Sequence, residues 1–162
     1  MPILTDDMKR VVRDHSPAFV ATVCPDGTPN VSPKGTTMAW DDDHLVFADL
    51  ASPGTMANLR ANPAVEINVV DPIVRTGYRF KGRAVVHTEG AEFERVAEFF
   101  ERERNLSRTR VRGVAVVTVL HAAELISPAY DVLTREEIVA RNLERFEHTY
   151  GVRVVPGAPR TT

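Results

Sequence analysis

The sequence predicts one domain over residues 1–162 that is mainly β within the α+β class: a six-stranded antiparallel barrel, closed or split, with peripheral helices. The 162 residues are 43% hydrophobic and 26% charged, which is typical of a compact globular domain. Six segments have the alternating or β-branched pattern of strands. These strands do not alternate with long helices, as the parallel units of a Rossmann-type sheet require.

The first third of the chain is predicted to contain one helix and three strands. The helix follows the N-cap residue Thr5, because acidic residues fill its first turn and apolar residues recur at helical spacing. Short turns separate the strands, so we expect them to pair consecutively as an antiparallel meander. The expected strands are Ala18 to Cys24, about Asn30 to Trp40, and His44 to Asp49.

The rest of the chain is predicted to contain three helices and three more strands. Ser52 and Pro53 suit the N-cap and the first position of a short helix, and Thr134 with Glu137 fits a capping box. The tail over 151–162 is Pro-rich and is expected to be loose. The expected helices cover residues 52–61, 93–100 and 134–150, and the expected strands cover 65–69, 78–86 and 114–120.

Composition and motifs exclude several classes of protein. The 20 Lys and Arg nearly balance the 22 Asp and Glu, so nucleic acid and membrane surfaces are not expected partners. A single cysteine, Cys24, and no signal-peptide pattern lead us to expect a cytoplasmic protein. The usual phosphate-loop, dinucleotide, nucleophile-elbow and His-x-x-x-His motifs are missing. No catalytic residue and no metal site can therefore be assigned.

The start of the second predicted helix has the composition of an anion-binding site. Ser52, Thr55 and Asn58 lie in its first turns, where free N–H groups and the helix dipole favour a phosphate. The alternative is that Ser52 only caps the helix.

The strand segment from Asn30 to Thr36 is irregular. It contains Lys34, one of only three lysines, between Pro33 and Gly35. Proline removes a hydrogen-bond donor and glycine removes a side chain, so a flat ligand could approach the backbone there. A bulged edge strand is the alternative interpretation.

A basic strand face begins with Arg75 and Tyr78, which flank Thr76-Gly77. We expect these two side chains to border the mouth of a substrate pocket. For Lys81 and Arg83, farther along the same strand, a solvated strand face is the preferred interpretation.

Several short motifs occur in a characteristic order along the chain. They are Ala21-Thr22-Val23 with Asp26-Gly27-Thr28-Pro29, Ser32-Pro33-Lys34-Gly35, Asn58-Leu59-Arg60 with Asn62-Pro63, and Gly82-Arg83-Ala84 followed by Thr88-Glu89-Gly90. In this order and spacing the chain resembles the pyridoxamine 5'-phosphate oxidase-like FMN-binding split barrels, a family that includes small flavin reductases. The resemblance covers about residues 18–125.

The resemblance implies a homodimer that binds FMN at the subunit interface and transfers electrons between the flavin and a small-molecule substrate. The residues that it assigns to the cofactor are Ser32, Pro33, Lys34, Gly35 and Thr36 along the ring, Phe47, Ala48 and Asp49 beside the ribityl chain and the ring, and Ser52, Thr55 and Asn58 at the phosphate.

The chain departs from the family pattern in two places. Members often have a basic residue near the position of Gly54, whereas this chain has none from Asp49 through Leu59. The phosphate would then rely on helix N–H groups, hydroxyls, Lys34 or an arginine of the other subunit. Residues 153–160 do not match the ending expected of pyridoxamine 5'-phosphate oxidase itself, so we expect a different substrate.

Two alternatives remain at this point. One is a deazaflavin in the same fold, whose acidic tail would contact arginines at 75, 79, 108, 110 and 112. The other is a non-enzymatic protein, either a carrier of flavin or haem or an empty barrel that binds a partner.

Overall fold

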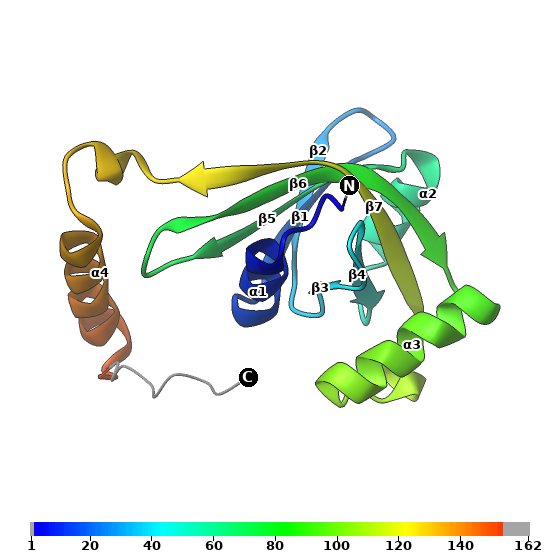
Figure 1. Ribbon diagram of the computed structural model, residues 1–162. Helices are drawn as coiled ribbons and strands as arrows, with labels where there is room; N and C mark the ends of the chain where they lie inside the picture. Colours follow the sequence, from blue (N-terminus) through cyan, green and yellow to red (C-terminus); the bar gives the residue numbers. More distant parts are fainter. Residues whose placement is uncertain (1, 154–162) are drawn as a thin grey trace. The chain divides into compact units, whose positions relative to one another are not determined.

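The chain forms two compact units in the computed structural model, which describes residues 2–153 (Figure 1). The first unit contains residues 2–70 and 77–125. The second contains residues 71–76 and 126–153. Most of the tail that the sequence predicts to be loose lies outside the described residues.

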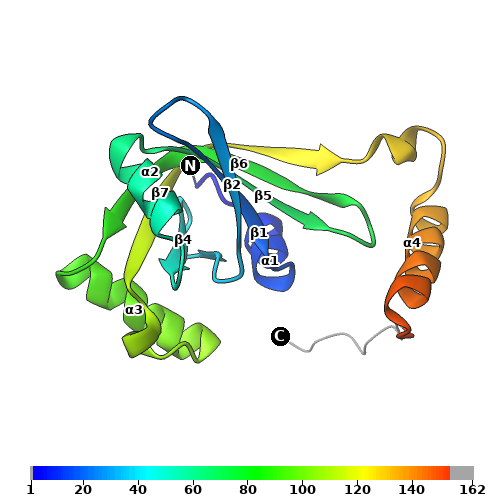
Figure 2. The ribbon, with the colours of Figure 1, turned by 180° about the vertical axis from the view of Figure 1, so that it is seen from behind.

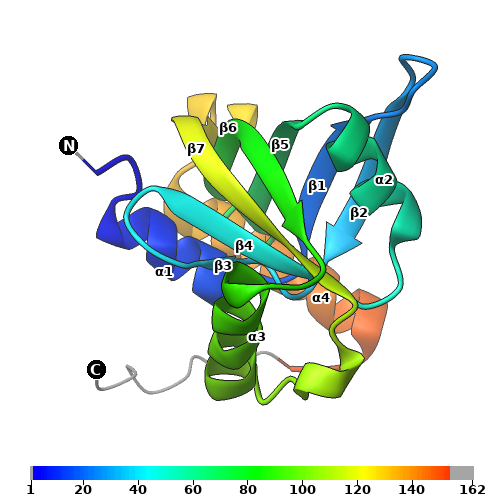
Figure 3. The ribbon, with the colours of Figure 1, turned by 90° about the vertical axis from the view of Figure 1, so that its right-hand side faces the viewer.

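The first unit is built on one curled antiparallel sheet of seven strands in the order β2-β1-β5-β6-β7-β4-β3 (Figure 3). This confirms the mainly β, split-barrel class that the sequence predicts. The strands are β1 (Ala18–Val23), β2 (Pro29–Lys34), β3 (Met38–Ala39), β4 (His44–Asp49), β5 (Ala64–Asp71), β6 (Thr76–His87) and β7 (Gly113–Ile126).

The structure corrects the predicted strand count from six to seven, because the strand expected from Asn30 to Trp40 is divided into β2 and β3. The chain turns between them, where both the N–H and the hydroxyl of Thr37 donate to the carbonyl of Lys34, at 3.4 and 3.1 Å. The predicted consecutive antiparallel pairings are confirmed, since β1 pairs with β2 and β3 pairs with β4. Because the middle strand is divided, these two pairs lie at opposite ends of the sheet order and do not form a continuous meander.

The α-helices begin close to the predicted residues. They are α1 (Asp6–Asp14), α2 (Pro53–Ala61), α3 (Ala91–Arg104) and α4 (Arg135–Tyr150), with short 3-10 turns η1 (Arg108–Arg110) and η2 (Pro128–Asp131). Thr5 caps α1 by accepting the N–H of Met8, and Thr134 forms the predicted capping box with Glu137. α2 contacts β1 at one end of the sheet (Figure 2).

Two apolar clusters pack against opposite faces of β4. Leu45 and Phe47 point into the interior of the curled sheet, together with buried residues of β1, β5, β6, α1 and α2. Val46 and Ala48 point the other way, into a cluster with Phe93 and other residues of α3. Because successive side chains of a strand alternate between faces, β4 is apolar along most of its length. Packing on both faces fixes the position where β4 ends, just before α2.

Candidate functional site

The curled sheet is open between β2 and β4. Since β3 has only two residues and pairs with Leu45 and Val46, the last residues of β4 have no strand partner on that edge. Thr36, just after β2, closes part of this gap: its hydroxyl accepts the N–H of Ala48 at 2.9 Å and donates to the Ala48 carbonyl at 3.4 Å. We call this place the split. It is formed by Ser32, Lys34 and Thr36 on one side and by Ala48, Asp49 and Ser52 on the other.

Lys34 is the central charged group of the split. Its side chain is almost completely buried, at 4% exposure, and its ammonium donates to the hydroxyls of Ser32 and Ser52 at 2.7 and 2.6 Å. Burial lowers the pKa of Lys34, and the nearby carboxylate of Asp49 partly opposes this shift. Among the described residues, Lys34 makes no ion pair within 4 Å. A buried ammonium held by neutral hydroxyls is poorly compensated and would be stabilised by an anion.

The start of α2 adds unused donors next to Lys34. Ser52 occupies the N-cap position, but its side chain does not cap the helix and instead accepts from Lys34, so the interpretation that Ser52 only caps is wrong. Its own N–H donates to Asp49 Oδ1 at 2.7 Å. Among residues 2–153, the N–H groups of Gly54 and Thr55 and the Thr55 hydroxyl have no hydrogen-bond partner. Three donors therefore remain available at one helix end.

Asn58 has a structural partner that the sequence analysis missed. Its side-chain amide donates to the hydroxyl of Thr22 at 3.1 Å, and Asn30 donates to the same hydroxyl at 3.1 Å. The first bond attaches α2 to β1, and the second joins β2 to β1. The signal in the sequence is the position of Thr22, because it continues the inward-facing alternation of Ala18 and Val20 with a polar side chain.

The other predicted ring and ribityl residues lie in different environments. Pro33 and Gly35 are exposed beside the split, as expected for an edge strand that has no further partner. The Phe47 ring is fully buried in the core, and Ala48 is buried against α3. Contact between any of these residues and a cofactor remains a prediction.

Tyr78 and Arg75, the two residues predicted to border a substrate pocket, have different surroundings. The Tyr78 hydroxyl donates to Asp7 Oδ2 at 2.7 Å, which raises the pKa of Tyr78 to about 12. This bond ties β6 to α1. Arg75 belongs to the second compact unit. Their role at a pocket mouth also remains a prediction.

Two of the arginines considered for a deazaflavin tail are already engaged. Arg79 Nε lies 2.9 Å from Glu66 Oε1. Arg108 makes two hydrogen bonds to Glu94, at 2.9 and 2.7 Å, and its guanidinium lies 4.1 Å from the centre of the Phe93 ring. Arg79 and Arg108 are therefore each paired with a nearby glutamate, Glu66 of β5 and Glu94 of α3.

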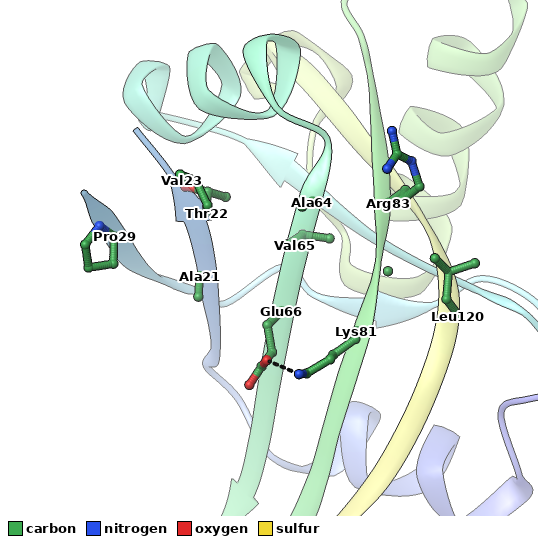
Figure 4. Close-up of a pocket in the computed structure, with 11 residues that line it drawn as sticks. Ala21, Thr22, Val23, Pro29, Ala64, Val65, Glu66, Lys81, Arg83 and Leu120 are labelled. Atoms are coloured by element: carbon green, nitrogen blue, oxygen red, sulfur yellow. Dashed lines mark ion pairs between the residues drawn. The ribbon is translucent and has the colours of Figure 1, made fainter. Parts of the chain in front are cut away.

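A groove of about 450 Å³ lies on the outer face of the sheet, and none of the predicted cofactor residues lines it (Figure 4). Ala21 and Ala64 face outward here, and because their side chains are small, the groove is not filled. Lys81 lies 3.6 Å from Glu66 within it. The sequence analysis did not identify this groove. Its lining residues are Ala21, Thr22, Val23, Pro29, Ala64, Val65, Glu66, Lys81, Gly82, Arg83 and Leu120.

Two further searches concern metals and membranes. Within residues 2–153, no group of three or more His, Cys, Asp or Glu side chains is placed to hold a metal ion. No helix in that part of the chain has both the length and the apolar character needed to cross a membrane.

The family model of pyridoxamine 5'-phosphate oxidase matches residues 4–125. The chain belongs to this family. A crystal structure of HupZ from Group A Streptococcus is 32% identical, with coverage of 76% of this chain and 94% of HupZ and a TM-score of 0.68. The match to the oxidase family ends at residue 125, so α4 and the residues around it lie outside it.

Two more distant structures share the fold of this oxidase family. An FMN-binding protein from Syntrophomonas wolfei is 16% identical, with coverage of 73% of this chain and 84% of that protein and a TM-score of 0.61. A structure named F420 reductase is 22% identical, with coverage of 74% and 98% and a TM-score of 0.58. No curated protein matches the chain.

Proposed function

We propose that this protein is an FMN-dependent oxidoreductase that transfers electrons between the flavin and an unidentified small molecule, and that the FMN phosphate binds at the split. The observation that carries the proposal is the buried ammonium of Lys34, held only by hydroxyls, beside the unused donors of Gly54 and Thr55.

The donors at the split fit a phosphate in number and kind. A phosphate ester presents three acceptor oxygens and close to two negative charges, and it binds well to helix N–H groups, hydroxyls and ammonium groups. Lys34 is the only cation among the residues of the split, and Asp49 lies near it. We therefore expect hydrogen bonds to contribute much of the affinity, in place of the basic residue common in the family near Gly54.

The flavin supplies the redox chemistry when it is bound. The chain's own residues bind and orient it. Lys34 and the first turn of α2 hold the phosphate, while the exposed Pro33 and Gly35 leave the β2 edge free of bulky side chains for a flat ring.

FMN is favoured over a deazaflavin by the engagement of Arg79 and Arg108 in ion pairs of their own. An acidic tail would have to break these pairs before it could use either guanidinium. The FMN-binding and F420-reductase structures share the fold at low identity, so they support both cofactors equally.

We also propose that two copies of the chain associate through the outer face of the sheet. Phe19, Val31 and Leu120 are 51%, 61% and 61% exposed, and all are large apolar side chains. The side chains of Phe19 and Ala21 point outward from β1, and Val31 pairs with Ala21 from the neighbouring strand β2. Leu120 lines the same groove as Ala21. Exposed apolar surface of this kind is typical of protein interfaces.

The experiment compares Thr55→Val with the wild type in titrations with FMN and with riboflavin, which lacks the phosphate. Thr55→Val keeps the shape of the side chain and removes its hydroxyl. Loss of one hydrogen bond to a charged group costs about 1.5–3 kcal/mol, so FMN should bind at least about tenfold more weakly while riboflavin binding is unchanged. An equal loss for both ligands would place the phosphate elsewhere. Turnover of a reduced nicotinamide by the FMN-loaded protein tests the oxidoreductase activity.

A further inference from the structure

The second compact unit contains a hairpin tip that is tied to the C-terminal segment. The Tyr130 hydroxyl donates to the carbonyl of Val74 at 2.8 Å, and the Asn142 side-chain amide donates to the carbonyl of Ile73 at 2.8 Å. The N–H of Ser127 donates to the carbonyl of Arg75 at 3.1 Å. Three successive carbonyls of the tip are therefore fixed by η2, α4 and the residue that precedes η2.

Arg75 has a backbone conformation that arginine rarely adopts. Its φ is +62°, in the left-handed region that favours glycine. The backbone is held there by the Arg75 N–H, which donates to the carbonyl of Asp71 at 2.7 Å, and by the bond from Ser127 to the Arg75 carbonyl. Residues held in such backbone conformations cluster at active sites and ligand-binding sites.

Arg75 lines a small cavity together with Arg141 of α4. The other lining residues are Ala129, Leu133, Ile138 and Asn142. Among the described residues, neither guanidinium makes a hydrogen bond or an ion pair. Glu137, four residues before Arg141, would be its ordinary helical partner. Its carboxylate instead accepts the N–H of Thr134 at 2.8 Å in the capping box.

We propose that the cavity between Arg75 and Arg141 is a binding site for the phosphate group of a small ligand. Two unpaired guanidiniums complement the nearly two negative charges of a phosphate monoester, and their planar N–H groups suit its oxygens. The cavity holds only about 10 Å³, which admits one oxygen atom and leaves the rest of the ligand outside. Apart from Arg75, its lining residues follow residue 125, where the match to the oxidase family ends, and none of them belongs to the split.

The experiment is an NMR titration of the arginine Nε–Hε signals of the full chain with inorganic phosphate and, separately, with acetate. Saturable shifts of the Arg75 and Arg141 signals are expected with phosphate, with at least tenfold weaker binding of acetate. Comparable binding of both anions would overturn the assignment to phosphate.

Arg75→Gly is the informative variant, because glycine adopts a positive φ without strain and the chain should fold at least as well. Arg75→Gly and Arg141→Gln should each weaken phosphate binding at least tenfold. Arg145→Gln, one turn along α4 and outside the cavity lining, is the control and should bind as the wild type does. The proposal fails if phosphate gives no saturable shift, if Arg75→Gly binds normally, or if Arg145→Gln weakens binding equally. FMN titration of Arg75→Gly reports on the split separately.

Discussion

Replacing Lys34 with methionine removes the ammonium from the split and keeps an unbranched side chain of similar length. Because Lys34 is 4% exposed, solvent screens its interaction with a bound phosphate only weakly. Loss of one charge-assisted hydrogen bond at about 1.5–3 kcal/mol corresponds to an increase of roughly 10- to 150-fold in the Kd for FMN. Riboflavin, which has no phosphate, should bind to Lys34→Met and to the wild type with similar affinity.

The assay is a fluorescence titration of FMN and riboflavin with the wild type, Lys34→Met and Arg60→Met. Arg60 is an exposed cation in the last turn of α2 and serves as the matched control. The free energy of unfolding of Lys34→Met should stay within about 1 kcal/mol of the wild type, since the ammonium has only neutral partners to lose and its burial is unfavourable. Unchanged FMN affinity in Lys34→Met, or an equal effect in Arg60→Met, would refute the role of Lys34.

The same variant tests the pH dependence of stability. Burial lowers the pKa of Lys34 below its ordinary value of 10.5, so between the lowered pKa and 10.5 the unfolded chain binds more protons than the folded chain. The free energy of unfolding of the wild type should therefore rise with pH across this window. Denaturant titrations at several pH values should show a smaller rise for Lys34→Met, and identical slopes would show that Lys34 is not desolvated.

Three further predictions concern stability. Tyr78→Phe should lower the free energy of unfolding by about 0.5–1 kcal/mol through loss of the bond to Asp7, and should remove a tyrosine that titrates near 12 in ultraviolet absorption; an unchanged titration curve would contradict this. Gly77→Ala should lower the free energy of unfolding by about 3 kcal/mol or more, because its Cβ would lie 2.0 Å from a backbone oxygen of β5. Gly54→Ala has open space around the new Cβ and should raise the free energy of unfolding by about 0.4–1 kcal/mol. Chemical denaturation that ranks the two variants the other way would disprove the packing of β5 against β6. Thr134→Ala should speed hydrogen exchange in α4, since loss of an N-cap costs about 1 kcal/mol, and unchanged exchange would show that the cap is dispensable.

The sequence predicts local structure well where the physical signal is local. The N-cap at Thr5, the capping box at Thr134 and the apolar, β-branched strand from Ala18 each depend on residues within a few positions of one another, and the structure confirms them. The sequence does not predict the break between β2 and β3, because Pro33 and Gly35 are interpreted as irregularities within one continuous strand.

The pairing of strands depends on contacts that sequence pattern does not contain. Consecutive β-strands usually pair, as β1 with β2 and β3 with β4 do here, but the division of the middle strand places β2 and β4 far apart in the strand order. The sequence-predicted residues Ser32, Lys34 and Ser52 nevertheless meet, across the split instead of along a shared ladder. From sequence alone, Ser52 is a possible N-cap of α2. In the structure the Ser52 hydroxyl accepts a hydrogen bond from Lys34 instead, and this contact is not evident from the sequence.

The relative affinity of the unmodified protein for FMN and riboflavin tests the central claim most directly. If Lys34 and the first turn of α2 hold the phosphate, FMN should bind at least about tenfold more tightly than riboflavin in equilibrium titrations at the same ionic strength. Equal affinities, or no binding of either flavin, would contradict the proposal.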